Sequence, residues 1–171
     1  GSGVALWALL ICRALGAHVW VTSSSAAKVE RAKQLGAAGG VLYTQPDWHK
    51  RLLADAGRFD VVVDGAGGAA FGRLVAALKP GGRLVTYGAT AGLPADLPIH
   101  KIFLAQCKVL GSTMGSPRDF LAFIDLVNRA KLTPVVDRVF PLDQALQALH
   151  RMRAGEHFGK LVLHIPQPAK T

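Results

Sequence analysis

The sequence predicts an α/β fold of the doubly wound kind, with helices on both faces of one parallel sheet. Short apolar, β-branched runs alternate along the chain with longer segments that carry apolar residues at helical spacing. Some of the short runs have no polar position, which is typical of strands that are buried on both faces. The 19 glycines, many of them between these runs, indicate tight turns that link strands to helices.

The first half of the chain contains four rounds of this alternation. An apolar stretch of helix length opens the chain and ends at Gly16, and a second helical segment, apolar on one face, ends at Gly36. The run DVVVD at 60–64 is apolar between two charges, which predicts a strand buried on both faces. The Pro-Gly-Gly of 80–82 stops a further helix. We expect helices over 4–15, 26–35, 47–56 and 69–78, and strands over 18–22, 41–43, 60–64 and 83–87.

The second half continues the pattern and contains the clearest helix start. Ser116 is a suitable N-cap, Pro117 suits the first helical position, and Asp119 lies in the first turn of a helix that runs to about residue 130. A last helix opens at Asp143 and stops at Gly155. Three of its apolar residues are expected to face inward: Leu146, Leu149 and Met152. We expect strands over 107–113, 135–140 and 160–165, one domain over 1–166, and a polar tail over 167–171.

The composition is that of a packed globular domain. The chain has 171 residues, half of them apolar, and this length allows a real hydrophobic core. Lys and Arg outnumber Asp and Glu by 20 to 11, for a net charge of +9, but they form no run of five or six. Such a charge suits nucleic acid, anionic lipid or a negatively charged small ligand, or a basic surface with no specific partner.

The cysteines and the most apolar run indicate in which compartment of the cell the protein lies. Cys12 and Cys107 lie in separate apolar segments, which predicts free buried thiols in a reducing compartment. The run over 4–12 is far shorter than the ~20 residues that cross a bilayer, and it lacks the features of a signal peptide. We therefore expect a cytoplasmic protein with no membrane segment. The chain begins without a methionine, which indicates either an expression remnant or an excerpt of a longer protein.

Glycines and hydroxyl side chains follow most of the predicted strands. In an open parallel sheet, ligands bind beyond the carboxyl ends of the strands, where small residues let backbone groups approach them. The segments at these ends are the serines 23–25, the glycine-rich 65–68 and 88–92, and 111–116. Their coincidence at one edge predicts a site for an extended ligand that carries phosphate.

The start of the chain and the serine segment refine this prediction. Gly3 and Val4 open a helix in the manner of a glycine-rich turn, where free N–H groups and the helix dipole favour a pyrophosphate. About 20 residues later, an acidic residue would take the ribose hydroxyls of a dinucleotide. Ser24, Ser25 and Lys28 lie there instead, and they would donate to a 2′-phosphate. Tyr43, at the next strand end, would flank the adenine or reach the same phosphate. The alternative is that the serines only cap the following helix.

Five stretches resemble the cofactor domain of the medium-chain dehydrogenases/reductases, and the branch most like them is that of quinone oxidoreductase-like and zinc-binding dehydrogenase enzymes. They are GSGVALWALLICRALGAHVWVTSSSAAKVERAKQLGA, VVVDGAGG, LKPGGRLVTYGATAG, VLGSTMGSPRDF and GEHFGKLVL. The resemblance covers nearly the whole chain. It implies a Rossmann fold with strand order 3-2-1-4-5-6. It also implies cofactor-binding residues: Gly3 and Val4 on the pyrophosphate, Ser24, Lys28 and Tyr43 on the NADP 2′-phosphate, Gly65, Ala66, Gly88 and Ala89 on the ribose–nicotinamide side, and Lys160 in the terminal Gly-Lys segment.

The resemblance further implies the NADP(H)-binding half of an oxidoreductase that transfers a hydride between nicotinamide and a carbonyl, enone or quinone. The family's first, central strand and its N-terminal substrate domain are not in this sequence. We therefore expect a fragment that is inactive alone and poorly stable, with apolar surface on either side of the missing strand. Catalytic residues stay unassigned. Zinc is expected only if its ligands lie in that other domain. The partners implied are a small-molecule substrate and a second copy, in a homodimer formed through the last strands.

The residues also bear on a metal site and on two other functions. The six histidines show no ligand spacing, so no metal site is expected in this chain. A non-catalytic Rossmann-like module that binds nucleic acid through its basic surface is the main alternative, supported by the net charge. A methyltransferase would favour an acid at the end of the second strand of such a fold, and the serines there argue against it.

Overall fold

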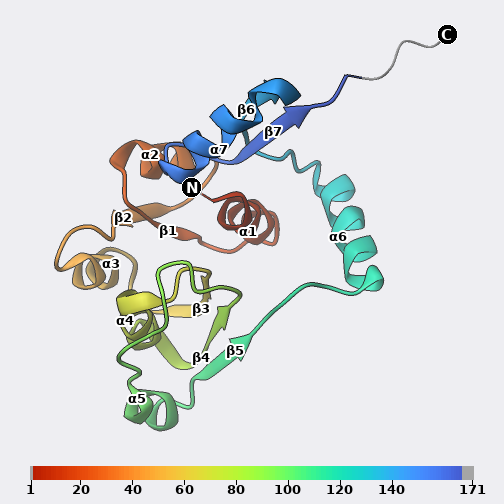
Figure 1. The fold of residues 1–171 in the computed structure, drawn as a ribbon. Helices are drawn as coiled ribbons and strands as arrows, with labels where there is room; N and C mark the ends of the chain where they lie inside the picture. The colour runs from red at the N-terminus through yellow and green to blue at the C-terminus, as the bar shows by residue number, and fades with distance from the viewer. Residues whose placement is uncertain (1, 167–171) are drawn as a thin grey trace.

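The computed structural model describes residues 2–166, and the predicted tail at 167–171 lies outside them. Helices and parallel strands alternate along the chain (Figure 1). The helices are α1 (Gly3–Ala14), α2 (Ala26–Gln34), α3 (Trp48–Ala56), α4 (Phe71–Ala76), α5 (Ile99–Leu104), α6 (Pro117–Ala130) and α7 (Ala145–Arg153), with short 3₁₀ turns at Gly68–Ala70 and Leu142–Gln144. The strands are β1 (Trp20–Ser23), β2 (Gly39–Leu42), β3 (Phe59–Asp64), β4 (Leu78–Thr86), β5 (Lys108–Gly111), β6 (Val136–Pro141) and β7 (Lys160–His164).

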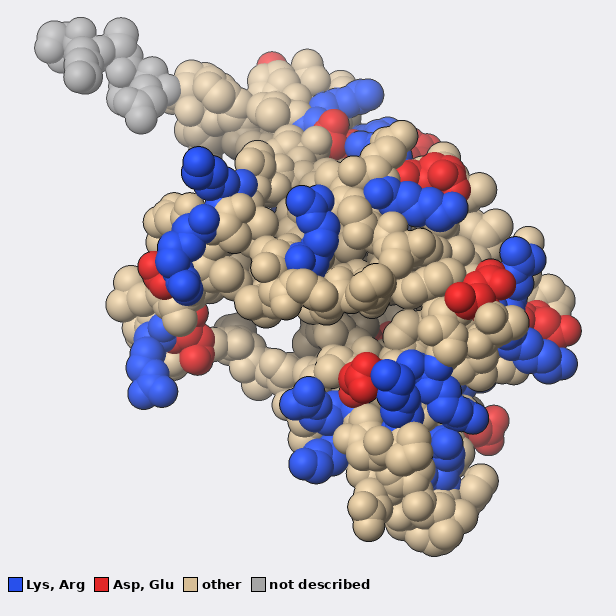
Figure 2. Space-filling view, turned by 180° about the vertical axis from the view of Figure 1, so that it is seen from behind, with Lys and Arg blue, Asp and Glu red and all other residues tan. Residues whose placement is uncertain are grey.

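The strands form three separate parallel sheets, with the orders β1-β2, β3-β4-β5 and β6-β7. The α/β class with parallel strands is thus confirmed. Among the described residues, β1 pairs with β2 and β3 pairs with β4, and no ladder joins β1 to β3. β1 and β3 thus belong to different sheets. An opening is visible near the middle of the space-filling view (Figure 2).

Three clusters of buried side chains form the core. The first joins Leu6 and Leu9 of α1 to Ala32 of α2 and to Phe158, which precedes β7. The second packs α4 on β4 through Val75 and Leu84, with further members from the segments beside them. The third lies between α3 and β2 around Trp48. The first cluster therefore packs the segment before β7 against α1, at the beginning of the chain.

On two elements the buried face differs from the one that the sequence predicts. β3 buries only one face, because α4 and α5 cover the side of Val62, whereas Val61 and Val63 are 42% and 48% exposed. On α7 the predicted inward residues Leu146, Leu149 and Met152 are all at least half exposed, and the buried residue is Ala148. Periodicity shows that a face is apolar but not which element covers it, and the small alanine allows α7 to approach β6 and β7 closely.

The region of 69–80 also differs, because the predicted helix ends earlier. Leu78 is fully buried and begins β4, which continues through Pro80, Gly81 and Gly82. The register between β3 and β4 shifts there, so that the proline lies in a bulge where no ladder hydrogen bond is required of it. The short helix α5, which has no buried residue, has no counterpart in the sequence prediction.

The start of α6 agrees with the prediction. The Ser116 hydroxyl accepts from the Asp119 N–H at 3.2 Å, and the Asp119 carboxylate accepts from the Ser116 N–H at 2.9 Å, which forms a capping box. The Ser116 hydroxyl also donates to the Asp119 carboxylate at 2.7 Å, and this bond, followed by the one from the Ser116 N–H, lowers the pKa of Asp119. Among the described residues, none of the helices is both long and apolar enough to cross a membrane.

Candidate cofactor-binding site

The N-terminus of α1 is the first part of the site. Ser2 caps the helix by accepting the Ala5 N–H at 3.2 Å, and the N–H groups of Gly3 and Val4 lie in the first turn, where a helix offers no acceptor of its own. The side chain of Lys160 lies against Gly3, since a Cβ added there would be 2.6 Å from its Cε and 2.9 Å from its Nζ. An ammonium beside a helix N-terminus is unfavourable by itself. An anion between the two would be favoured by both.

The end of β1 is the second part. Ser23 is buried and its hydroxyl accepts the Ser25 N–H at 3.3 Å. Ser24 is exposed, and Ser25 occupies the N-cap position of α2 without a side-chain cap hydrogen bond. The alternative that these serines serve only to cap the helix therefore gains no support from the structure. Tyr43 lies beside them, because its N–H donates to the Ser23 carbonyl at 3.0 Å, and its side chain is half exposed.

Lys28 has a partner that its position in the sequence does not predict. Its ammonium donates to the carbonyl of Gly155, at the end of α7. Lys28 lies in the first turn of α2, after Ser25 at the N-cap, while its Nζ bonds to a segment far along the chain. A ligand phosphate beside Ser24 and Ser25 would compete with that carbonyl for the ammonium.

The glycine-rich turns after β3 and β4 form the third part. Asp64, buried at the end of β3, accepts the Gly67 N–H at 2.8 Å and the Ala66 N–H at 3.3 Å. The next turn is bonded to this one, because the Ala91 N–H donates to the Ala66 carbonyl and the Gly68 N–H to that of Gly92, both at 2.8 Å. The predicted residues of both turns are thereby brought together: Gly65, Ala66, Gly88 and Ala89.

Asp60 and Asp64 have unrelated roles, although they bracket the same strand. Asp60 pairs with Lys79 at 2.8 Å on the surface, and the hydrogen bond from Lys79 lowers the pKa of Asp60. Asp64 holds backbone N–H groups instead. The structure therefore gives no acid/base pair, in agreement with the ~13 Å separation that four residues of strand impose.

Tyr87 links the first and third parts, and sequence reasoning did not select it. Its ring covers Gly65, where an added Cβ would be 2.5 Å from Cζ and 2.6 Å from Oη. Burial raises the pKa of the Tyr87 phenol, a hydrogen bond with Ser2 lowers it, and the charge of Asp64 raises it. The tyrosine thus reaches from β4 to the α1 N-terminus, across the division between β1 and β3. Its place directly after a strand, at the same edge as the glycine turns, is the signal that could have found it.

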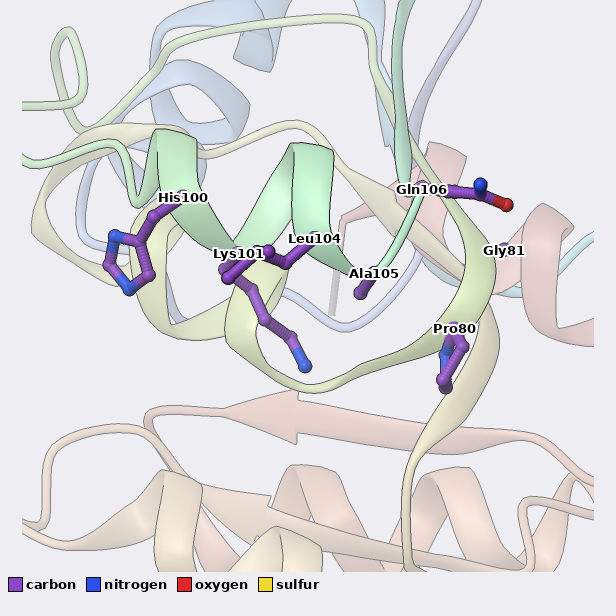
Figure 3. A pocket seen from close by; sticks show the side chains of 7 residues that line it. All are labelled: Pro80, Gly81, His100, Lys101, Leu104, Ala105 and Gln106. Carbon is purple, nitrogen blue, oxygen red and sulfur yellow. The ribbon is translucent and has the colours of Figure 1, made fainter.

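A surface hollow lies away from these three parts. A cavity of about 610 Å³ is lined by residues of β4 and α5, among them Pro80, His100 and Lys101 (Figure 3). It adjoins the amino ends of β4 and β5, because Gly81 donates to the carbonyl of Ala105, just before β5. The predicted site residues follow the carboxyl ends of the strands, so this cavity is not part of their site.

The basic surface is interleaved with acidic side chains. In Figure 2 lysines and arginines are scattered over the face shown, with Asp and Glu among them. Several charged side chains of the described residues pair along a helix, such as Lys33 with Glu30 at 2.8 Å and Arg51 with Asp55 at 2.7 Å. A continuous basic stripe of the kind that tracks a nucleic-acid backbone is not seen on this face.

Parallel α/β elements with glycine-rich turns beyond the strand ends define a Rossmann-like domain. The family model of zinc-binding dehydrogenases matches residues 3–129. The zinc-type alcohol dehydrogenase-like protein YogA of Leptosphaeria maculans is 39% identical over 96% of this chain and 49% of that protein. The zinc-type alcohol dehydrogenase-like protein C1773.06c of Schizosaccharomyces pombe is 32% identical over the same shares of the two chains. A crystal structure of an NAD-dependent alcohol dehydrogenase has a TM-score of 0.88 at 38% identity, and covers 96% of this chain and 49% of that one.

The chain therefore belongs to the zinc-binding dehydrogenase family, a branch of the medium-chain dehydrogenases/reductases, and corresponds to its cofactor domain. It is a family of oxidoreductases. The chain spans about half the length of the curated relatives named above.

The described residues of this chain do not fit the zinc that the family name implies. Within residues 2–166, no three His, Cys, Asp or Glu side chains lie together in a group that could hold a metal ion. We assign no chemical step to a metal in this chain.

Proposed function

We propose that this chain binds NADP(H) and forms the cofactor-binding part of an oxidoreductase. The observation that carries the proposal is the pairing of two anion-binding features at one edge of the fold. One is the α1 N-terminus with Lys160 beside it. The other is the hydroxyl and lysine group after β1, where the sequence from Val21 to Lys28 contains no carboxylate. Two such features suit a ligand with a pyrophosphate and a separate phosphate.

The roles of the residues follow from their places. The N–H groups of Gly3 and Val4, with Lys160, bind the pyrophosphate, while Ser24, Ser25 and Lys28 bind the 2′-phosphate and Tyr43 flanks the adenine. Gly65, Ala66, Gly88 and Ala89 present a surface with little side chain to the nicotinamide end, and Tyr87 borders it as a neutral phenol. When bound, the cofactor supplies the hydride chemistry, and this domain orients it.

The names of relatives support a nicotinamide cofactor, but they differ on whether that cofactor carries a 2′-phosphate. A protein of Danio rerio named as a mitochondrial NAD(P)H oxidoreductase is 30% identical over 99% of this chain. The 38% identical alcohol dehydrogenase of known structure is described as NAD-dependent. Our choice of NADP therefore rests on the serines and Lys28 of this chain.

For the whole protein we propose hydride transfer between nicotinamide and a carbonyl, enone or quinone of a small molecule. We further propose a cytoplasmic homodimer in which residues 1–166 form the cofactor domain of a two-domain enzyme. The cofactor domain would be inactive alone, because in such an enzyme the substrate cleft lies in the other domain.

The test is the substitution Lys28→Glu in the full-length gene product, with dissociation constants for NADPH and NADH measured by fluorescence titration. A charge-assisted hydrogen bond contributes about 1.5–3 kcal/mol, so NADPH affinity should fall about 10- to 100-fold. NADH affinity should change less than about threefold, since NADH has no 2′-phosphate to lose.

Lys33→Glu is the matched control, because Lys33 lies on the same helix and pairs with Glu30. It should leave both constants within about threefold. Lys28 also holds Gly155, and the NADH constant reports any loss from that contact. Equal losses for the two cofactors in Lys28→Glu would refute the phosphate assignment.

A further inference from the structure

Lys160 begins β7, and its position depends on residues 155–159, which join α7 to it; we call residues 155–160 the GK loop. The N–H of Lys160 donates to the carbonyl of Val135 at 2.8 Å. Gly159 has a φ of +107°, and a Cβ there would collide with the same carbonyl. The loop therefore turns tightly against the start of β6, and a side chain at position 159 would push it away.

Asp137 of β6 holds the other side of this turn. Its side chain is 4% exposed, and its carboxylate accepts the N–H of Phe158 at 3.0 Å. Arg151 of α7 donates to the same carboxylate through Nε at 2.7 Å and Nη2 at 3.3 Å. A buried carboxylate with this many donors is fully partnered, and removal of one partner would be costly. The hydrogen bond from Arg151 lowers the pKa of Asp137 most, and burial opposes it.

The GK loop also contacts α2, the helix that carries Lys28. The guanidinium of Arg31 lies 4.2 Å from the centre of the Phe158 ring, and its Nη1 is 4.0 Å from Asp137. Lys28 donates to Gly155 at the start of the loop. Residues from both ends of the proposed dinucleotide site thus contact the GK loop. Asp137 holds this loop through the hydrogen bond that its carboxylate accepts from the Phe158 N–H.

We propose that Asp137 is a positioning residue for dinucleotide binding. It holds the GK loop so that the Lys160 ammonium lies at the α1 N-terminus, where the pyrophosphate binds. This inference rests on the proposed function, because it needs Lys160 to contact the ligand. Asp137 itself touches no ligand, so its effect on affinity passes through Lys160.

The test is a double-mutant cycle of Asp137→Asn and Lys160→Ala in the full-length gene product, with NADPH and NADH dissociation constants as the readout. Asn is similar in size but cannot pair with the charge of Arg151. We expect each single substitution to weaken both cofactors about tenfold, the effect of one charged hydrogen bond. The ratio of the NADPH dissociation constant to the NADH dissociation constant should stay that of the unsubstituted protein. The double variant should bind no worse than Lys160→Ala, because the aspartate acts only through that lysine.

Asp125→Asn is the control, since Asp125 is an exposed partner of Arg129 at 3.0 Å on α6, outside the GK loop, and it should leave both constants within about twofold. If Asp137→Asn fails to fold, Arg151→Lys keeps the charge but loses the two-pronged contact, and it should show the same dependence on Lys160 at about threefold. Additive losses in the double variant, or no loss in Asp137→Asn, would overturn the positioning role. A Lys160→Ala protein with unchanged affinity would instead overturn the pyrophosphate assignment in the proposed function.

Discussion

Replacement of Phe158 by alanine is expected to lower the free energy of unfolding by about 3–5 kcal/mol, the usual range for a buried phenylalanine. Phe158 is 2% exposed and packs in one cluster with Leu6 and Leu9 of α1 and Ala32 of α2. It is the buried member of that cluster from the C-terminal part of the chain. The loss therefore includes the cavity and the attachment of β6, α7 and β7 to the rest of the domain.

Urea denaturation of the full-length gene product, followed by far-UV circular dichroism, measures this change. Phe158→Leu is the control, because it keeps most of the buried volume and should cost less than about 1.5 kcal/mol. Similar losses in the two variants would show that packing at this position does not hold the C-terminal unit. A loss below about 1 kcal/mol in Phe158→Ala would contradict the burial seen here.

The substitution Gly67→Ala is expected to separate the two glycine-rich turns and to weaken cofactor binding at least tenfold. Gly67 has φ +66° and ψ −133°, a conformation that L residues rarely adopt. A Cβ there would be 2.6 Å from the Gly92 carbonyl oxygen and 3.3 Å from the Ala89 Cα, which are backbone atoms that cannot rotate away. We expect a loss of stability of about 2–4 kcal/mol, since strain alone costs about 1–3 kcal/mol.

Gly57→Ala is a closely matched control for this prediction. Gly57 ends α3 with φ +75° and ψ −159°, and an added Cβ would meet nothing within 4 Å. Both variants pay the strain of a similar backbone conformation, and only Gly67→Ala adds the collision. Chemical denaturation and NADPH titration of the two proteins should therefore differ in both stability and affinity. Equal losses of stability with unchanged NADPH affinity would show that the paired turns do not shape the site.

Local sequence signals predicted the elements that depend on neighbouring residues. Ser116, Pro117 and Asp119 predicted the start of α6, because a capping box is formed by residues three apart. The alternation of short apolar runs with helical segments predicted the α/β class, which the relatives of known structure confirm. The faces of β3 and α7 were predicted wrongly, since the exposure of Val61, Val63 and Leu146 depends on which distant element covers them.

The candidate site likewise combines residues predicted from local signals with contacts that depend on packing. Its glycines and serines were predicted from their places after the strands, a rule that needs only the order of the elements. The contact of Lys28 with Gly155 and the ring of Tyr87 over Gly65 were not, because they join side chains to segments that only packing brings near.

By itself, then, the sequence determined the α/β class, most of the helices and strands in their order, the glycine-rich turns, and the absence of a carboxylate between β1 and Lys28. These features arise from backbone preferences and charges of residues close along the chain. Only the tertiary structure placed Lys160 against Gly3 and brought the Asp137 carboxylate to the Phe158 N–H of the GK loop. Such contacts arise when buried side chains such as Phe158 pack remote segments together, and packing depends on the shape of the whole fold.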